Sequence, residues 1–304
     1  MKNLKKIIRL LIGVVFIASS ILKLLSVDHF ELYIYSFGIF NFFITTLLSR
    51  LLITFEFLLG IFLIFKLLYH KTWWLSMLTM IGFTLFLIYV AFFRNDANCH
   101  CFGNFVELDP TGSIFKNIAI ILMLLFVKNQ KEWSFRFKKW IMGAFIGIAI
   151  IGSFVVVPPD ALYNKIYTPK TKVNEKELQK IMQDSNLVEI SKVEGDHILA
   201  FFVSGCKYCK MSMQKMDQIF KRNNISSDRI KIIILGDQTK INTFKEETKT
   251  DLYTFYAYNN PMIFFNAVYG SFPTIIYMHD SKIEKVINYR GVDEKDMVNF
   301  LTQK

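Results

Sequence analysis

The sequence predicts two parts: an α-helical transmembrane bundle of about five spans with its N-terminus inside, followed by an α/β domain. Of the 304 residues, 53% are hydrophobic and 31 are Phe, yet the second half carries the charge density of a soluble protein. From about Val173 the long apolar runs give way to short runs separated by turns. We therefore expect a transmembrane domain over residues 1–157, a linker over 158–172 and the α/β domain over 173–304.

The first apolar segment, Ile7 to Leu25, follows a basic N-terminus and admits two interpretations. The small residues Ala18-Ser19-Ser20 would suit a cleaved signal peptide. The run is long for such a peptide, however, and it has no clear A-x-A cleavage site, which favours an uncleaved helix that starts inside. Under either interpretation the chain emerges on the outer side after this segment.

The next segments differ in length. Residues 46–69 and 73–93 can each cross about 30 Å of hydrocarbon, and the short turn between them predicts a helical hairpin. Residues 28–43 are aromatic but interrupted by charges, which indicates the outer interface. Ile114 to Val127 would reach only roughly 21 Å as a helix. Because the basic block after it belongs inside, we expect this segment to cross as well.

The number of crossings decides where the cysteines lie. Residues 140–157 form the fifth predicted span, so the following domain is expected outside. The four cysteines form two close pairs, Cys99 with Cys101 and Cys206 with Cys209. Both pairs would then share one oxidising face of the membrane.

The C-x-x-C motif from Cys206 to Cys209 follows an apolar strand at residues 198–203 and opens a predicted helix. The unpaired N–H groups at a helix N-terminus favour a thiolate, and Lys207 adds positive charge. This layout is typical of a dithiol that exchanges with disulfides of other proteins. A structural disulfide is the alternative.

The other elements of the α/β domain follow from short apolar runs and turn residues. Residues 237–269 show no clear period and stay unassigned. We expect helices over residues 174–183, 207–221 and 293–301, and strands over 230–235, 274–278 and 283–288.

Cys99 and Cys101 are separated by one residue, so a disulfide between them would be strained and readily reduced. Such a pair can accept electrons from the Cys206–Cys209 pair. A purely structural disulfide that cross-links the loop is the alternative. Metal binding by Cys99, His100 and Cys101 is less favoured, since consecutive residues do not easily complete a tetrahedral site.

Three methionines, Met211, Met213 and Met216, follow the C-x-x-C motif and raise the alternative of copper binding. Methionine on a helix face is more typical of core packing, so we expect no resident metal. In the membrane part, Lys23 and Glu56 are costly ionisable residues within spans. An ion pair that fixes the bundle and a role in proton or quinone chemistry both remain open for them.

The last 130 or so residues resemble the thioredoxin superfamily in two features. These are the strand that runs into Cys206-Lys207-Tyr208-Cys209 and the Phe272-Pro273 step before the penultimate strand. The resemblance implies that Pro273 is cis, that it sits beside the cysteine pair, and that the loop of Phe272 and Pro273 binds substrate backbone.

The first 155 or so residues resemble the family of methylamine utilisation protein MauE and DoxX, which is related to the vitamin K epoxide reductase group. The resemblance covers all four helices of that family's bundle and implies thiol transfer or disulfide formation at the outer membrane face. The matching residues are Ser19-Ser20-x-x-Lys23-Leu24, Phe30-x-x-x-Ile34-x-x-Phe37-Gly38, Glu56-x-x-x-Gly60, Cys99-His100-Cys101-Phe102-Gly103 and Lys116-Asn117.

Together these features predict a membrane thiol–disulfide oxidoreductase that passes electrons between substrate cysteines, the Cys206–Cys209 pair and the Cys99–Cys101 pair. No motif for a bound cofactor is present, and resemblance to vitamin K epoxide reductase homologues with fused thioredoxin domains makes a membrane quinone one candidate for the final acceptor. Those homologues carry a second cysteine pair in the bundle, which this chain lacks. We expect a multi-pass protein of the bacterial inner membrane, with its thioredoxin-like domain on the periplasmic face. Its expected partners are cysteine-containing envelope proteins, the lipid membrane and its own second domain.

Two other functions compete with this prediction. A reductive thiol relay or maturation factor for one partner, such as a methylamine-dehydrogenase-like protein, would use the same cysteines in the opposite direction. A non-catalytic assembly or copper-delivery protein would not exchange disulfides. A nucleic-acid-binding function is excluded by the absence of any such motif, and the net charge of +11 is explained by basic loops beside apolar segments.

Overall fold

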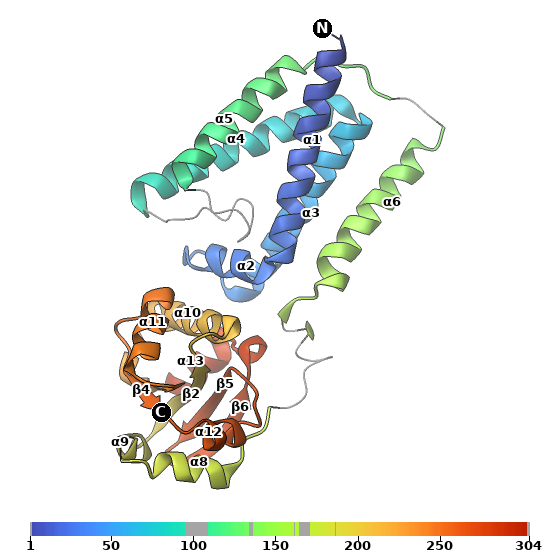
Figure 1. Ribbon diagram of the computed structural model, residues 1–304. Coiled ribbons are helices and arrows are strands. Elements are labelled where there is room, and N and C mark those ends of the chain that lie inside the picture. Colours follow the sequence, from blue (N-terminus) through green and yellow to red (C-terminus); the bar gives the residue numbers. More distant parts are fainter. Residues whose placement is uncertain are drawn as a thin grey trace. The chain divides into compact units, whose positions relative to one another are not determined.

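The structure is a computed structural model that describes residues 2–94, 109–133, 136–160, 162–163, 171–185 and 187–302. The chain divides into two compact units (Figure 1). The first unit comprises residues 1–34 and 43–158, and the second comprises residues 35–42 and 159–304.

The first unit is a bundle of apolar helices. Four of them, over Lys2–Leu25, Phe42–Phe65, Tyr69–Phe93 and Lys138–Val155, are long and apolar enough to cross a membrane. With the shorter α5, the predicted bundle of about five spans is confirmed. The helices are α1 (Lys2–Leu25), α2 (Val27–Tyr35), α3 (Phe42–Phe65), α4 (Tyr69–Phe93), α5 (Pro110–Phe126) and α6 (Lys138–Ile151), which continues into a π-helical turn over Gly152–Val156.

Helix α5 is 17 residues long and begins one turn before the predicted segment at Ile114. Asp109 caps this extra turn, since its side chain accepts a hydrogen bond from the Gly112 N–H at 3.2 Å. Pro110 occupies the first turn, where a missing N–H costs nothing. The polar start of the helix was missed because it lacks the apolar residues on which the prediction relied.

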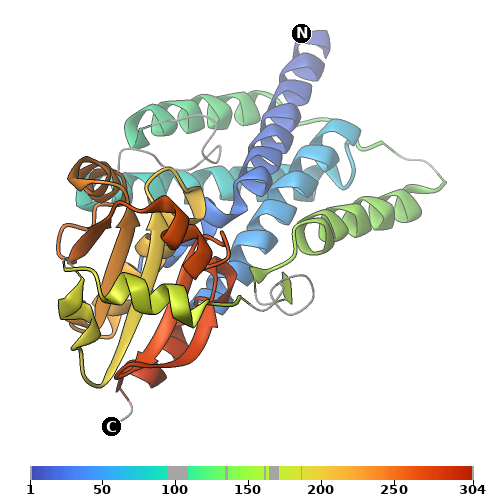
Figure 2. The ribbon, with the colours of Figure 1, turned by 60° about the horizontal axis from the view of Figure 1, so that its bottom comes forward.

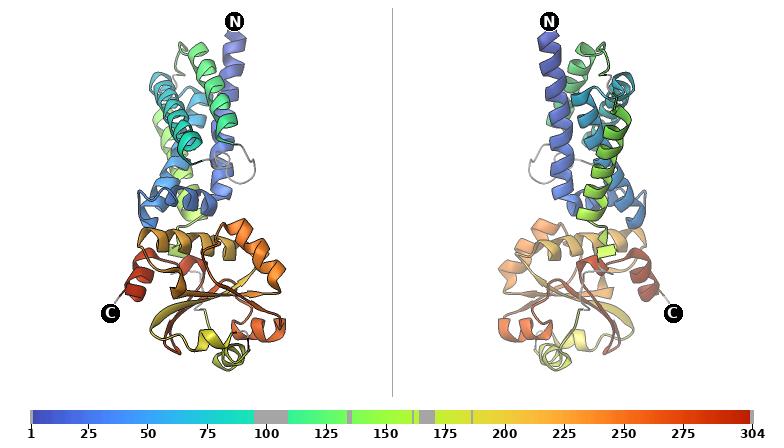
Figure 3. Two further views of the ribbon diagram at one scale, coloured as in Figure 1. Left: turned by 90° about the vertical axis from the view of Figure 1, so that its left-hand side faces the viewer. Right: turned by 90° about the vertical axis from the view of Figure 1, so that its right-hand side faces the viewer.

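Helices α4 and α5 pack side by side as a hairpin (Figure 3). The Trp73 indole N–H donates to the Leu124 carbonyl at 2.8 Å, and the Tyr69 hydroxyl donates to the Val127 carbonyl at 2.6 Å. These bonds satisfy polar groups that would otherwise be unpaired in an apolar environment.

Two glycines let α1 and α3 touch. A Cβ on Gly13 would lie 2.9 Å from the Gly60 carbonyl oxygen, and a Cβ on Gly60 would lie 2.7 Å from the Gly13 oxygen. Only glycine allows backbones this close, as in membrane helix pairs with small residues at the interface. By contrast, a Cβ on Gly143 or Gly147 of α6 would meet no described atom within 4 Å, so this G-x-x-x-G pair makes no close contact.

The second unit contains a five-stranded mixed sheet with the order β4-β3-β2-β5-β6. Strands β2, β3 and β4 run parallel, whereas β5 is antiparallel to both β2 and β6. The strands predicted over residues 198–203, 230–235, 274–278 and 283–288 correspond to β2, β3, β5 and β6. The strands are β2 (Asp196–Val203), β3 (Ile230–Leu235), β4 (Phe255–Tyr258), β5 (Thr274–His279) and β6 (Lys282–Ile287).

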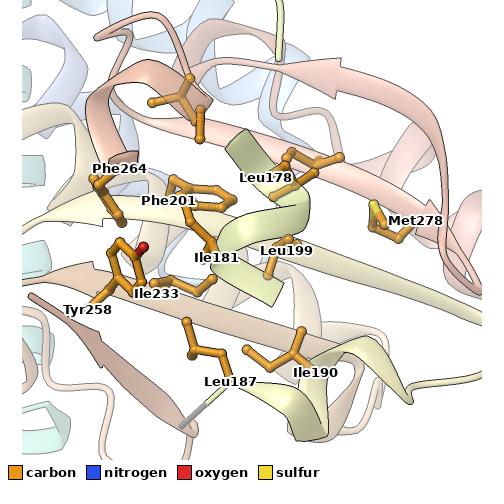
Figure 4. Packing of buried hydrophobic residues seen from close by; sticks show 13 residues of the cluster. Leu178, Ile181, Leu187, Ile190, Leu199, Phe201, Ile233, Tyr258, Phe264 and Met278 are labelled. Carbon is orange, nitrogen blue, oxygen red and sulfur yellow. The ribbon is translucent and has the colours of Figure 1, made fainter. Parts of the chain in front are cut away.

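Helices cover both faces of this sheet (Figure 2). On one face, α8 and α12 pack over a cluster that includes Phe201, Ile233 and Phe264 (Figure 4). On the other face, the ring centroid of Phe202 lies 5.7 Å from that of Phe244 in α11. The helices are α8 (Glu175–Met182), α9 (Val188–Ser191), α10 (Lys207–Arg222), α11 (Gln238–Thr248), α12 (Pro261–Ala267) and α13 (Glu294–Thr302).

The unassigned residues 237–269 form α11, β4 and α12. Helices α11 and α12 each have a side-chain N-cap. The Asp237 side chain accepts from the Lys240 N–H, and the Asn260 side chain accepts from the Ile263 N–H. The strand between them has only 4 residues and α12 has 7, too few for a period to emerge.

Candidate active site

Cys206 lies where strand β2 passes into helix α10. The chain turns after Val203, with the Cys206 N–H donating to the Val203 carbonyl at 3.0 Å. Cys206 has extended backbone angles and is the N-cap of α10. Its Sγ accepts a hydrogen bond from the Cys209 backbone N–H at 3.2 Å. The strand therefore delivers this sulfur to the end of a helix whose first N–H groups face it.

This position lowers the pKa of the Cys206 thiol to about 6. The largest cause is the hydrogen bond from the Cys209 side chain, and the backbone N–H groups of Cys209 and Tyr208 and the charge of Lys210 act in the same direction. Burial raises the pKa of the thiol, but by less than these groups together lower it. Half-buried Cys206 is therefore largely ionised at neutral pH, which is the form that a nucleophilic cysteine requires.

Cys209 has the opposite environment. It is 0% exposed, and burial, followed by its hydrogen bond to Cys206 and the charge there, raises the pKa of its thiol above the ordinary value. A buried neutral thiol beside a half-buried thiolate suits the resolving step of disulfide exchange. Both sulfurs are free thiols in this structure.

Two lysines, Lys207 and Lys210, lie near the Cys206–Cys209 pair in the sequence. Lys207 Nζ lies over its neighbour, 5.6 Å from the centroid of the Tyr208 ring. Lys210, one helical turn after Cys206, contributes positive charge to the thiolate and forms an ion pair with Glu247 at 2.7 Å. Sequence reasoning missed Lys210, although the spacing of four residues from Cys206 places it one turn along the helix.

The Phe272–Pro273 peptide is cis. Because Phe201 pairs with Thr274 across β2 and β5, Pro273 lies beside the end of the strand that leads to Cys206. The Phe272 ring stacks on Phe264 with centroids 5.6 Å apart. The role of Phe272 and Pro273 in substrate binding stays a prediction.

The second cysteine pair, Cys99 and Cys101, lies outside the described residues. The methionines after the C-x-x-C motif, Met211, Met213 and Met216, are at most 1% exposed, as expected for core packing. Within the described ranges, no cluster of His, Cys, Asp and Glu could hold a metal ion.

In the first unit, Lys23 and Glu56 form an ion pair. Lys23 Nζ lies 2.6 Å from Glu56 Oε1 and 2.7 Å from Oε2, and the two side chains are 5% and 2% exposed. Ser19 also donates to Glu56, at 3.5 Å. Both charges are thus satisfied inside an apolar bundle.

A second buried ion pair, between Glu31 and Arg50, was not predicted. Thr46 donates to Glu31 at 3.2 Å, and Arg50 donates to the Val157 carbonyl at 3.3 Å, which ties α2, α3 and the end of the α6 segment together. In the sequence, Glu31 and Arg50 each interrupt an apolar stretch, as Lys23 and Glu56 do, and this pattern could have predicted the second ion pair.

Three comparisons with known proteins bear on this chain. Residues 1–128 match the family described as Methylamine utilisation protein MauE. Protein TlpB of Flavobacterium psychrophilum is 25% identical over 291 aligned residues, which cover 79% of each protein. A secreted disulfide oxidoreductase of Mycobacterium tuberculosis, described as homologous to E. coli DsbE, is similar in structure with a TM-score of 0.30 and 11% identity, over 38% of this chain and 86% of that one.

The fold of the second unit is thioredoxin-like by its own geometry. A central strand leads to a C-x-x-C motif at a helix N-terminus, and a cis-proline precedes the neighbouring antiparallel strand. The chain therefore joins a MauE-like membrane domain, matched over residues 1–128, to a thioredoxin-like domain that carries Cys206 and Cys209.

Proposed function

We propose that this multi-pass membrane protein is a thiol–disulfide oxidoreductase that promotes disulfide formation in envelope proteins. The observation that carries the proposal is the asymmetry of the pair, in which Cys206 has a lowered pKa of about 6 and Cys209 is fully buried. A dithiol whose thiolate is stabilised has a stabilised reduced form, and its disulfide is correspondingly a stronger oxidant. This favours the oxidative direction over a reductive relay.

In the oxidative direction, a substrate thiolate attacks the Cys206–Cys209 disulfide at Cys206 Sγ, and Cys209 leaves and takes up a proton. A second substrate thiolate attacks the substrate sulfur of the mixed disulfide and releases the Cys206 thiolate. Two substrate thiols become one disulfide, and the pair gains two electrons. Because the hydrogen bonds from Cys209 and the helix N-terminus stabilise the departing Cys206 thiolate, the last step is favoured.

The electrons would pass from the reduced pair to the disulfide of Cys99 and Cys101, the predicted acceptor in the membrane domain. The expected placement of the thioredoxin-like domain on the periplasmic side of a bacterial inner membrane supports this relay, because disulfides persist there. The buried methionines of α10 give the copper-delivery alternative no support.

Trapping tests the proposal. In cells that express the Cys209→Ser chain, Cys206 should accumulate mixed disulfides with envelope proteins. These are detected as covalent adducts that a reducing agent cleaves. The double variant Cys206→Ser/Cys209→Ser is the matched control and should form none. Absence of adducts from the Cys209→Ser chain, or a Cys206–Cys209 potential near the roughly −270 mV of thioredoxin, would contradict the oxidative function.

A further inference from the structure

Three segments of the first unit meet at one end of the helix bundle (Figure 1). They are the start of α1, the turn between α3 and α4, and the residues that follow α5. The Arg9 side chain of α1 donates to the carbonyls of Leu63 and Ile64 at the end of α3. The backbone N–H of Trp133, which follows α5, donates to the Lys66 carbonyl in the turn at 3.3 Å. These hydrogen bonds hold the three segments together.

This end of the bundle carries a group of positive charges, which we call the basic cluster. The two stretches of chain that supply it contain no acid, since Asp and Glu are absent from residues 1–27 and 57–95. Among the described residues, no carboxylate lies within ion-pair distance of any member of the cluster. The charge of the cluster is therefore not neutralised by the described part of the protein. Its members are Lys2, Lys5, Lys6 and Arg9 of α1 and Lys66 of the turn after α3.

Two members of the basic cluster are withdrawn from water. Arg9 is 3% exposed, and among the described residues its Nε has no hydrogen-bond partner. Lys66 is half-buried. Burial, followed by the positive charges of Arg9, Lys6 and Lys2, lowers the pKa of the Lys66 ammonium. The members of the cluster thus repel one another, and a bound anion would relieve this repulsion.

The surroundings of the basic cluster favour a lipid over a soluble anion. Leu4 and Ile7 flank the lysines of α1 in the sequence, and both side chains are exposed. The Lys5 Nζ lies 5.4 Å from the centroid of the Phe126 ring, which is exposed as well. Helices α1 and α3 are long and apolar enough to cross a membrane. Their charged ends therefore lie where lipid headgroups meet the hydrocarbon, and the exposed apolar side chains contact acyl chains.

We propose that the basic cluster binds the headgroup of an anionic phospholipid. The phosphate of the lipid lies beside the ammonium groups of Lys6 and Lys66, and its acyl chains lie against Leu4 and Ile7. Arg9 is occupied by the α3 carbonyls and contributes its charge from below the surface. A zwitterionic phospholipid binds less well, because its own cation offsets the phosphate. The bound lipid joins α1 to the α3–α4 turn and is independent of the cysteine chemistry.

Native mass spectrometry measures the binding of single lipids. The full chain is purified in a neutral detergent, delipidated, and titrated with phosphatidylglycerol or with phosphatidylcholine of the same acyl chains. The fraction of protein that carries one lipid gives an apparent dissociation constant for each. Because one basic residue near an anionic surface contributes up to about a fivefold change in affinity, we expect the cluster to prefer phosphatidylglycerol about tenfold or more.

Variants locate the site. Lys6→Gln and Lys66→Gln should each weaken phosphatidylglycerol binding up to about fivefold, and the double variant should lose most of the preference. The matched control is Lys139→Gln, which removes an exposed positive charge at the start of α6 outside the basic cluster and should leave binding unchanged. Thermal unfolding in detergent verifies that each variant is folded. Arg9 is kept in every variant, since its loss would also free the α3 carbonyls.

The source of the phosphate is tested by competition. Glycerophosphoglycerol, the same headgroup without acyl chains, should not displace phosphatidylglycerol at equal concentration, because it cannot contact Leu4 and Ile7. Displacement would indicate a site for a soluble phosphate and would overturn the proposal. Equal binding of the two phospholipids by the wild type, or unchanged binding in Lys6→Gln/Lys66→Gln, would also overturn it. So would a loss in Lys139→Gln as large as in Lys6→Gln, which would indicate unspecific attraction to a basic surface.

Discussion

The backbone N–H of Cys209 donates to the Sγ of Cys206 at 3.2 Å, so the fully buried residue of the pair stabilises the charge on the half-buried one. The same helix turn therefore creates two unlike thiols. One is ionised near neutral pH and the other is kept protonated by burial. This asymmetry has measurable consequences.

The pH dependence of alkylation should reveal the low pKa of Cys206. In the reduced Cys209→Ser chain, the rate at which iodoacetamide alkylates Cys206 should rise with pH and reach half its maximum near the Cys206 pKa of about 6, because the new hydroxyl at position 209 can donate in place of the thiol. In the Cys206→Ser chain, Cys209 should stay unreactive at neutral pH until the domain is unfolded. A midpoint for Cys206 near about 8.5, the ordinary cysteine value, would contradict the site geometry.

The same shift makes the stability of the reduced protein depend on pH. The folded pKa of Cys206 lies below that of an unfolded chain, about 8.5, so ionisation favours the folded state. This contribution is complete above about pH 8.5 and is lost as the pH falls through about 6. Denaturant unfolding of the reduced wild type and of Cys206→Ser should therefore diverge with rising pH between these values. Parallel curves would show that the thiolate is not stabilised.

The Lys210–Glu247 ion pair should influence the pKa of the Cys206 thiol. Lys210→Met removes a positive charge and should raise the Cys206 pKa, whereas Glu247→Gln releases Lys210 from its partner and should lower it. Because the pair is partly exposed, each change in alkylation rate at fixed pH should stay below about tenfold. Lys207→Met is the matched control, since the Lys207 ammonium lies over the Tyr208 ring, and it should have the smaller effect. Equal effects of Lys207→Met and Lys210→Met would support the role predicted for Lys207.

Much of this architecture could be predicted from the sequence because it depends on periodicity. The uninterrupted apolar runs predicted the long helices, and the strand before Cys206 was placed within two residues of its observed start. The segment with α11, β4 and α12 could not be predicted, because short elements are defined by capping side chains and strand pairing. The contact of Lys210 with Glu247 and the contact of Arg9 with the end of α3 could not be predicted either, since both depend on which helices become neighbours.

The contact between Gly13 and Gly60 should matter to the stability of the membrane domain. In Gly13→Ala the new Cβ would lie 2.5 Å from Ile64 Cγ1 and 2.9 Å from the Gly60 carbonyl oxygen, so α1 and α3 must separate. Overpacking of this kind typically costs about 1–3 kcal/mol. Gly143→Ala is the matched control, because its Cβ meets no described atom within 4 Å and alanine is the better helix former. Thermal unfolding in detergent should show a lower midpoint for the first variant only.

The Lys23–Glu56 pair should be more sensitive to the loss of one partner than to the loss of both. Lys23→Met leaves the Glu56 carboxylate buried without its cation, which typically costs about 3–5 kcal/mol. Lys23→Met/Glu56→Gln removes both charges and should recover much of that loss, since the amide oxygen introduced by Glu56→Gln can still accept from Ser19. Unfolding midpoints of the wild type, both single variants and the double variant, measured in detergent, complete a double-mutant cycle. Additive losses would mean that the two groups do not stabilise one another, and that the charge on each is satisfied separately.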